Sequence, residues 1–163
     1  MPTETIQPAA EGYVRDWVIL AGSGKVVAVQ APDDDDTSAI RGLPGIICDQ
    51  AYTLTSNAIP VGAVINSVSV YTRCARYASA STIATGLYLS GVLSSGPDQA
   101  LPVAYTSYTD VISRPGGGAW AVSDLASVQV VIQQKTANRS RCTSLWVIVN
   151  YTPPPSAFFH LFP

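Results

Sequence analysis

The longest regular pattern in the sequence is a period-two alternation over residues 64–77. Val68 and Val70 fall on one side of an extended chain, while Ser69 and Arg73 fall on the other. Successive side chains of a strand point to opposite faces of a sheet, so this pattern predicts a half-buried antiparallel strand. A chain built around such a strand needs further strands to cover its apolar side.

Similar segments follow one another along most of the chain. Leu145, Val147 and Val149 alternate with Trp146 and Ile148, so both faces of that strand are apolar and we expect it to be central or covered on both sides. About eight strands at intervals of roughly 10–15 residues, with no long helix, predict an all-β fold, an antiparallel β-sandwich of jelly-roll type. The predicted strands are residues 16–20, 25–30, 46–55, 64–77, 84–92, 103–113, 128–132 and 143–152.

The segment of residues 119–132 is interpreted as the corner that pins the sandwich. Trp120 and Leu125 are expected to be anchors, and Ser123 and Asp124 to form a turn or a short helical cap. The three glycines before it are interpreted as a long turn between strands, in preference to a backbone that approaches a ligand.

The 163 residues fit one domain with its own core. Residues 1–13 contain two prolines and few apolar side chains, and we expect an extended N-terminal arm. Residues 14–152 form the predicted sandwich. Residues 153–163 begin with three prolines, which stiffen a chain into an extended spacer, and form a C-terminal tail.

Composition excludes some functions. The net charge is -2 and charged residues make up only 12% of the chain, which argues against nucleic acid as a partner. Lys135, Arg139 and Arg141 are the nearest approach to a basic cluster and are interpreted as a solvated hairpin loop. No apolar run reaches the roughly 18 residues of a spanning helix, so we do not expect a membrane as a partner. No secretory signal is recognised, so we expect the protein to be made in the cytoplasm.

Three cysteines, Cys48, Cys74 and Cys142, occur in apolar strand contexts without the spacing of a zinc site. They are interpreted as buried thiols. A disulfide between Cys74 and Cys142 is the alternative if their strands are neighbours.

The acidic run of residues 33–36 is interpreted as a solvated loop before the segment that follows it. Calcium is the alternative, because hard cations bind several oxygen ligands. Asp34 and Asp36 would then be the ligands, since they lie on one side of an extended chain. No other cofactor is expected.

The sequence contains no arrangement typical of catalysis. His160 is the sole histidine and lies in the tail, without a nucleophile elbow elsewhere. Glu4 and Glu11 are the only glutamates and both lie in the expected arm. The sequence therefore predicts a protein that is not an enzyme.

The tail contains all three phenylalanines of the chain. Phe158, Phe159, Leu161 and Phe162 would expose an apolar surface of the size that marks an interaction site. Two alternatives remain open: the cluster packs back on its own sandwich, or it docks on a neighbouring subunit or partner.

Four segments carry a resemblance to a known group of proteins. DDDDTSAI, VINSVSVYTRCAR, YTSYTDVISRPGGGAWAVSDLASVQVVI and SLWVIVNYTP together resemble small jelly-roll virion proteins of tailed bacteriophages, over roughly residues 14–152. The resemblance implies a non-enzymatic structural virion protein, with head decoration (cement) proteins and modules of tails or fibres as its known roles.

Two functional hypotheses follow from the resemblance. The first is a capsid decoration protein on the virion surface that binds the major capsid protein and copies of itself, as a homotrimer, through its arm and tail. The alternative is a carbohydrate- or receptor-binding module of a tail or fibre, with Tyr71, Tyr88, Tyr105 or Tyr108 as stacking platforms. Neither the position in the virion nor the symmetry is fixed by the sequence.

Overall fold

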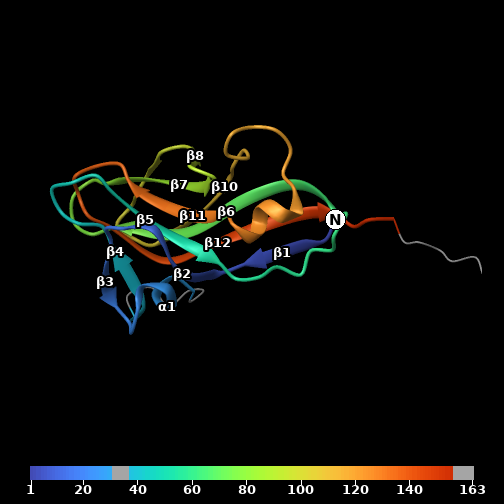
Figure 1. The fold of residues 1–163 in the computed structure, drawn as a ribbon. Helices are drawn as coiled ribbons and strands as arrows, with labels where there is room; N and C mark the ends of the chain where they lie inside the picture. The colour runs from blue at the N-terminus through green and yellow to red at the C-terminus, as the bar shows by residue number, and fades with distance from the viewer. Residues whose placement is uncertain (31–36, 156–163) are drawn as a thin grey trace, which may run out of the picture.

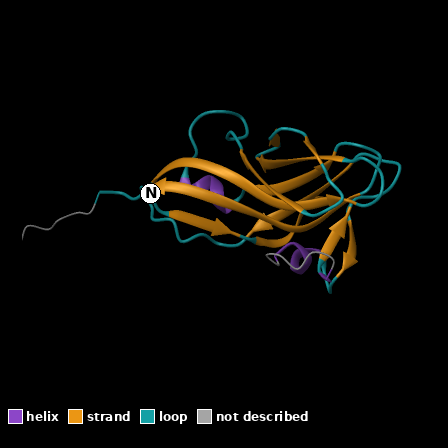
Figure 2. Ribbon diagram, turned by 180° about the vertical axis from the view of Figure 1, so that it is seen from behind, coloured by secondary structure: helices purple, strands orange, loops and turns teal. Residues whose placement is uncertain are grey.

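The computed structural model describes residues 1–30 and 37–155, which form two antiparallel sheets packed face to face (Figures 1 and 2). Sheet A contains β1 (Thr3–Ile6), β3 (Val18–Ala21), β4 (Ala39–Arg41), β6 (Val64–Arg76), β10 (Thr106–Val111) and β12 (Ser140–Thr152). Sheet B contains β2 (Pro8–Arg15), β5 (Cys48–Leu54), β7 (Thr82–Leu89), β8 (Val92–Ser95), β9 (Gln99–Ala100) and β11 (Gln129–Gln134). The predicted all-β antiparallel sandwich is confirmed.

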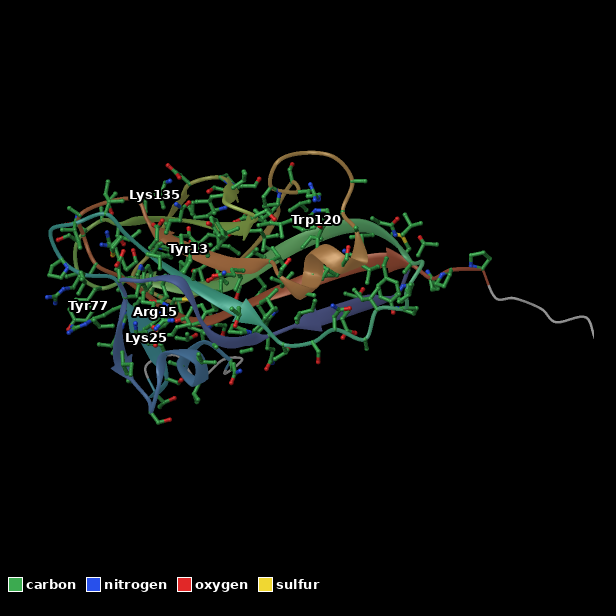
Figure 3. All side chains as sticks on the ribbon, in the orientation of Figure 1. Tyr13, Arg15, Lys25, Tyr77, Trp120 and Lys135 are labelled. Carbon is green, nitrogen blue, oxygen red and sulfur yellow. The ribbon has the colours of Figure 1, made fainter. Side chains whose placement is uncertain are left out.

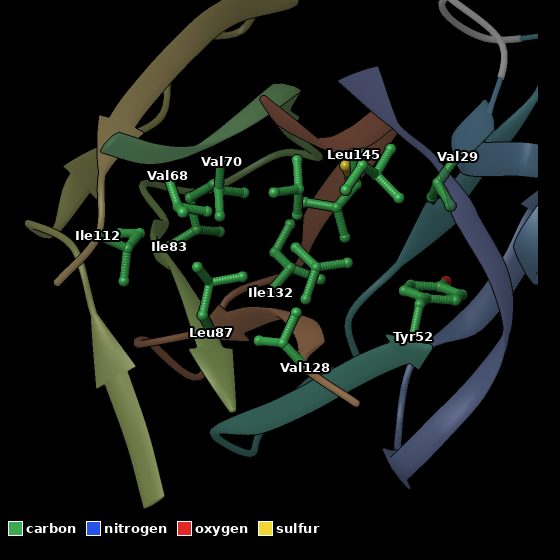
Figure 4. Packing of buried hydrophobic residues seen from close by; sticks show 14 of the residues in the cluster. Val29, Tyr52, Val68, Val70, Ile83, Leu87, Ile112, Val128, Ile132 and Leu145 are labelled. Carbon is green, nitrogen blue, oxygen red and sulfur yellow. The ribbon is translucent and has the colours of Figure 1, made fainter. Parts of the chain in front are cut away.

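The longest strands of sheet A, β6 and β12, lie side by side in its interior. The order in sheet A is β10-β6-β12-β4-β3, with β1 also paired to β12, and the order in sheet B is β2-β5-β11-β7-β8, with β9 paired to β7. The alternation in the sequence decides which side chains enter the core: Val70 and its cross-strand partner Val147 are fully buried between the sheets. Opposite them, Val130 and Ile132 of β11 fill the same layer, part of which is visible in Figure 4.

Residues 25–30 form helix α1 (Lys25–Gln30), so the strand predicted there is wrong. The amide of Ala28 donates to the carbonyl of Gly24 at 2.9 Å, and the turn buries Ala28 and Val29 completely. A hexapeptide of mostly apolar residues has no clear period, so packing decides its conformation. Here one helical side is drawn into the core, where Figure 4 shows Val29 at the edge of the buried cluster.

The N-terminal segment is also different from the prediction. Residues 1–13 do not project as an arm, because β1 pairs with the last strand and Ile6 is buried in the core. The chain then crosses to the other sheet, where β2 pairs with β5. Pro8 begins β2 at the edge of sheet B, a position where a missing amide costs no hydrogen bond.

The segment before β11 forms the corner that the sequence predicts, with Leu125 and Trp120 as its anchors. A short 3-10 helix, η2 (Val122–Ala126), buries Leu125, while Trp120 is half-buried against the core. The preceding loop has three successive glycines with φ of 80°, 82° and 77°, at residues 116, 117 and 118. That left-handed conformation favours glycine, so the turn explains all three.

The three cysteines are buried and free, as the interpretation as buried thiols predicts. Cys74 and Cys142 are direct cross-strand partners, and the hydroxyl oxygen of Thr72 lies 3.1 Å from one sulfur and 3.3 Å from the other. Burial raises the pKa of the Cys74 thiol well above its ordinary value.

The two ends of the described chain lie at one end of the sandwich. The amide of Tyr151 donates to the carbonyl of Pro2 at 3.2 Å. The loops that follow β4, β6 and β11 lie at the opposite end (Figure 1). Within the ranges that the structure describes, no helix has the length and apolar character needed to cross a membrane.

Candidate ligand-binding face

The outer face of each sheet carries one stacked pair of aromatic rings. On sheet A, the rings of Tyr71 and Trp146 have centroids 4.3 Å apart and planes within 6° of each other. On sheet B, Tyr13 stacks on Tyr88 with centroids 3.9 Å apart and planes at 22°. Two of the tyrosines predicted as platforms, Tyr71 and Tyr88, therefore lie on opposite sides of the molecule.

The other two predicted tyrosines have different surroundings. The ring of Tyr105 lies under the guanidinium groups of Arg73 and Arg141, at 6.0 Å and 4.7 Å from its centroid. Tyr108 packs against the core, and its hydroxyl donates to the carbonyl of Ala100 at 3.3 Å. The prediction of Tyr108 as an open platform is therefore wrong, because its ring faces inward on β10.

The register of sheet B determines which other side chains share a face with Tyr88. Tyr88 pairs with Gln129, which pairs with Thr53 across β11, and all three point outward because their sequence neighbours fill the core. Four residues further along β11 lies Gln133, which pairs with Asp49 on one side. Between these two rows lies Val131, which pairs with Ala51 on one side and Gly86 on the other and is fully buried.

A bulge in β2 brings Tyr13 over this face. The pairing of β2 with β5 is interrupted between Glu11 and Arg15, and the amide of Tyr13 instead donates to Oε1 of Gln129 at 2.8 Å. Gly12 makes the close approach possible, because a Cβ atom there would lie 2.9 Å from the Cβ of Ala51. The ring of Tyr13 is then 47% exposed on top of the sheet.

A chain of hydrogen-bonded polar side chains crosses the same face at Gln133, four residues along β11 from the position that pairs with Tyr88. The hydroxyl of Ser95 donates to Oε1 of Gln133 at 2.7 Å, and Nε2 of Gln133 donates to Oδ2 of Asp49 at 3.2 Å. Gln133, itself only 8% exposed, is thereby held by side chains of β8 and β5. The three groups have fixed orientations before any ligand arrives.

The carboxylate of Asp49 is partly desolvated. Burial raises its pKa above the ordinary value, and the hydrogen bond from Gln133 opposes that change. The positive charge of Lys135, two residues beyond Gln133, also lowers the pKa of Asp49. Asp49 is therefore a strong acceptor placed close to neutral donors.

Lys25 has a structural role. Its ammonium lies 2.8 Å from Oε2 of Glu11 and donates to the carbonyl of Arg15 at 3.1 Å. The hydrogen bond from Lys25 lowers the pKa of Glu11. These contacts hold α1 to β2 immediately beside the bulge that carries Tyr13.

The remaining predicted site residues lie outside the described residues. Asp34 and Asp36, the calcium candidates, fall in residues 31–36, and Phe158, Phe159, Leu161, Phe162 and His160 fall in residues 156–163. Within residues 1–30 and 37–155, no cluster of three or more His, Cys, Asp or Glu side chains is placed to hold a metal ion. The calcium site and the docking tail stay predictions.

Sequence reasoning found Tyr88 but missed its neighbours on the face. Tyr13 was assigned to the arm, and neither Gln133 nor Asp49 was selected. Period-two counting from Tyr88 marks the outward positions of one strand only. The signal that links the strands is their register, and a single sequence does not contain it.

Comparisons with solved structures find a similar fold at low sequence identity. No protein-family model and no curated protein matches the sequence. A family 11 carbohydrate-binding module from Clostridium thermocellum, solved with a β-1,3-1,4-mixed-linked tetrasaccharide, is 10% identical, with 88% of this chain and 95% of that chain covered and a TM-score of 0.45. A structure described as CBM4 is 13% identical, with 84% and 95% covered and a TM-score of 0.43.

A third solved structure, a family 16 carbohydrate-binding module, is 10% identical, with 71% of this chain and 75% of that chain covered and a TM-score of 0.32. All three TM-scores are below 0.5, which is too low for any of these proteins to assign a ligand to this chain.

Proposed function

We propose that the protein is a non-catalytic carbohydrate-binding β-sandwich and that its glycan lies on the outer face of sheet B. The observation that carries the proposal is the joint placement of a stacked aromatic pair, the exposed Tyr13 on the half-buried Tyr88, with a hydrogen-bonded polar chain, Ser95, Gln133 and Asp49. The sequence suggests carbohydrate binding as the alternative to capsid decoration, and of the residues on this surface it selects Tyr88 alone.

The two parts of the face match the two sides of a sugar. A pyranose ring has an apolar C–H surface, which stacks on an aromatic ring, and an edge of hydroxyl groups, which donate and accept hydrogen bonds. Tyr13, held by the Gln129 carboxamide, provides a rigid aromatic surface. Asp49, which is half-buried, provides a carboxylate that the buried Gln133 already orients, and this lowers the entropic cost of binding.

The spacing along the sheet is suited to an oligosaccharide. Gln129 and Gln133 are four residues apart on β11, a span of about 13 Å at the rise of an extended strand. Tyr88 pairs with the first of them, and Asp49 pairs with the second. A glycan that follows β11 contacts rings at one position and polar groups further along.

The same face is poorly suited to glycosidic cleavage. Hydrolysis uses two carboxyl groups across the scissile bond, about 5–10 Å apart. Asp49 is the sole carboxylate that the described strands place on this face; the carboxylate of Asp16, from the turn after β2, lies beside it and accepts the amide of Asp49 at 3.4 Å. The proposal is therefore binding without turnover.

The test is affinity electrophoresis through gels that contain a soluble neutral polysaccharide, run with a panel of β-glucan, xylan and mannan. We expect at least one polysaccharide to retard the protein, and Tyr13→Ala to weaken that binding about tenfold, in keeping with the loss of one stacked ring. Gln133→Ala alone should weaken binding more than Tyr13→Ala does, since Asp49 and Ser95 then lose the side chain that holds both of them.

Tyr71→Ala is the matched control, because it removes a stacked tyrosine from the opposite sheet. It should leave retardation unchanged. Absence of retardation by every polysaccharide in the panel, or an equal loss in Tyr71→Ala and Tyr13→Ala, would overturn the proposal.

A further inference from the structure

A separate pocket lies at the loop end of the sandwich, away from both ends of the described chain. Its volume is about 410 Å³, and it is formed by the β4–β5, β6–β7 and β11–β12 loops. Tyr77, Ser79, Asn138 and Arg139 line it, and Figure 3 shows Tyr77 at this end of the molecule. The volume lies within the range of sites that enclose a small organic ligand, roughly 300–1,000 Å³.

The chain segments around the pocket are positively charged. The three loops that form it, residues 42–47, 77–81 and 135–139, contain Lys135 and Arg139 and no Asp or Glu. Arg41, Arg76 and Arg141 lie on the strand ends that adjoin these loops. Strand pairing brings several together, since Arg141 is the cross-strand partner of Arg41 and Ser140 is the partner of Arg76.

Arg139 is fixed in position by the ring of Tyr77. Its guanidinium carbon lies 5.6 Å from the ring centroid, and the carbonyl of Arg139 accepts the amide of Tyr77 at 3.0 Å. Stacking occupies the flat side of a guanidinium and leaves its N–H donors in the plane, where they can meet a carboxylate in a fork geometry. Among the described residues, none accepts a hydrogen bond from this side chain.

One pocket-lining side chain has a buried polar atom without a partner, Nε of Arg139. Nε of Arg76, Oγ of Ser81 and Oγ of Ser140, whose residues are close in sequence to the pocket-lining loops, are likewise buried without a hydrogen-bond partner in the described structure. Ser81 and Ser140 are themselves 3% and 0% exposed. Buried polar groups are normally satisfied, so the unsatisfied guanidinium of Arg139 in the wall of a cavity marks a place where a polar ligand or water binds.

We propose that this end pocket binds a carboxylated sugar, a uronic acid unit, with Arg139 receiving the carboxylate and the exposed ring of Tyr77 forming a wall for the sugar. The basic loop was interpreted from the sequence as a solvated hairpin; here it lines one side of a ligand site. The site is distinct from the sheet B face, and it stands whether or not that face binds a glycan.

The test is titration of ¹⁵N-labelled protein with sodium glucuronate and, in parallel, with glucose, its neutral counterpart, at constant ionic strength. We expect glucuronate to bind at least about tenfold more tightly, with the amide signals of Gly45, Tyr77 and Ser79 shifted and those of Tyr13 and Tyr88 unchanged. Sodium sulfate is titrated as a third probe. If sulfate binds as tightly as glucuronate at the same amides, the site is a general oxyanion site and the sugar-acid assignment is overturned.

Arg139→Gln should reduce glucuronate affinity about tenfold or more, and Arg139→Lys should restore only part of it, because an ammonium lacks the planar fork. Arg15→Gln is the matched control, as it removes one exposed positive charge from β2. If Arg15→Gln lowers the affinity for glucuronate by the same factor, the effect comes from net charge alone and the proposed site is wrong.

The amide shifts in the unmodified protein keep the proposal testable if Arg139→Gln does not fold. Tyr13→Ala, which tests the sheet B face, should leave glucuronate binding intact, so failure of one proposal is distinguishable from failure of the other.

Discussion

Arg114 and Asp124 meet through two parallel hydrogen bonds, from Nε to Oδ2 at 2.8 Å and from Nη2 to Oδ1 at 3.1 Å. The same carboxylate accepts the amide of Ala121 at 2.9 Å, and the arginine also donates to the carbonyl of Gly117 at 2.9 Å. One ion pair therefore ties the glycine loop to the 3-10 helix that precedes β11.

Asp124→Asn should weaken this corner in a pH-dependent way. The hydrogen bond from Arg114 lowers the pKa of Asp124 below its ordinary value of 3.8. A carboxyl whose pKa is depressed by folding stabilises the folded state above its unfolded pKa, and that contribution disappears as the pH falls through the folded pKa. Because the pair is partly exposed, we expect a loss of less than about 1 kcal/mol at pH 7.

Urea unfolding of both proteins at pH 7 and at pH 3 or below measures this. The difference in the free energy of unfolding should be present at pH 7 and shrink towards zero in acid. A difference of the same size at every pH would show that the amide acts through packing rather than charge.

Gly12→Ala should destabilise the fold and loosen Tyr13. The added Cβ would lie 2.9 Å from the Cβ of Ala51 and close to the Gln129 carboxamide, so the bulge in β2 has to move. Overpacking of this kind costs about 1–3 kcal/mol. Thermal unfolding measures the cost, and near-ultraviolet circular dichroism reports the tyrosine pair.

Gly24→Ala is the control for that change. A Cβ there meets no atom within 4 Å, and we expect its effect to be within about 0.5 kcal/mol. Equal effects of the two substitutions would mean that close approach at Gly12 is not what places Tyr13.

The three thiols should be protected in the native protein. Cys48 is 3% exposed, and Cys74 and Cys142 are 0% exposed, so a thiol reagent has no access to them without unfolding. Ellman's reagent should detect no thiols in buffer and three in urea without reductant. Two thiols fewer in urea would reveal a disulfide between Cys74 and Cys142.

The virion hypothesis stays a prediction and has its own test. A chain that ends at Pro155 lacks Phe158, Phe159, Leu161 and Phe162, whose burial would contribute several kcal/mol at about 25 cal/mol per Å². If the tail docks on a capsid, the shortened chain should bind undecorated phage heads more weakly than the full chain in a sedimentation assay. Equal binding of the two would contradict a docking role for the tail.

The strands with a clear period were predicted well, and the reason is physical. In β6 and β12 the apolar alternation is long, and a slip of one residue would expose every core side chain, so local pattern and global fold agree. Leu125 and Trp120 were also predicted as anchors, since large apolar side chains beside a turn have few other places to pack.

The errors lie where tertiary contacts outweigh local pattern. Residues 25–30 become a helix because one side of that turn fills a space beside Tyr52 and the core. The N-terminal segment becomes two strands because it pairs with residues 35 to 147 positions away, and its own composition does not show these partners. The candidate face needs four strands in register and one bulge, so no single segment identifies it.

The pairing of β1 with β12 has a consequence for how the chain folds. Thr3 and Asn150 are joined side chain to side chain at 3.1 Å across 147 residues. Contacts of such separation form slowly, because a long loop must close before they bring any stabilisation. On the ribosome, the first strand is made early and has no partner in its sheet until the last one emerges. Sheet A is therefore completed only once β12 has emerged from the ribosome, and β1 is exposed to proteases until then.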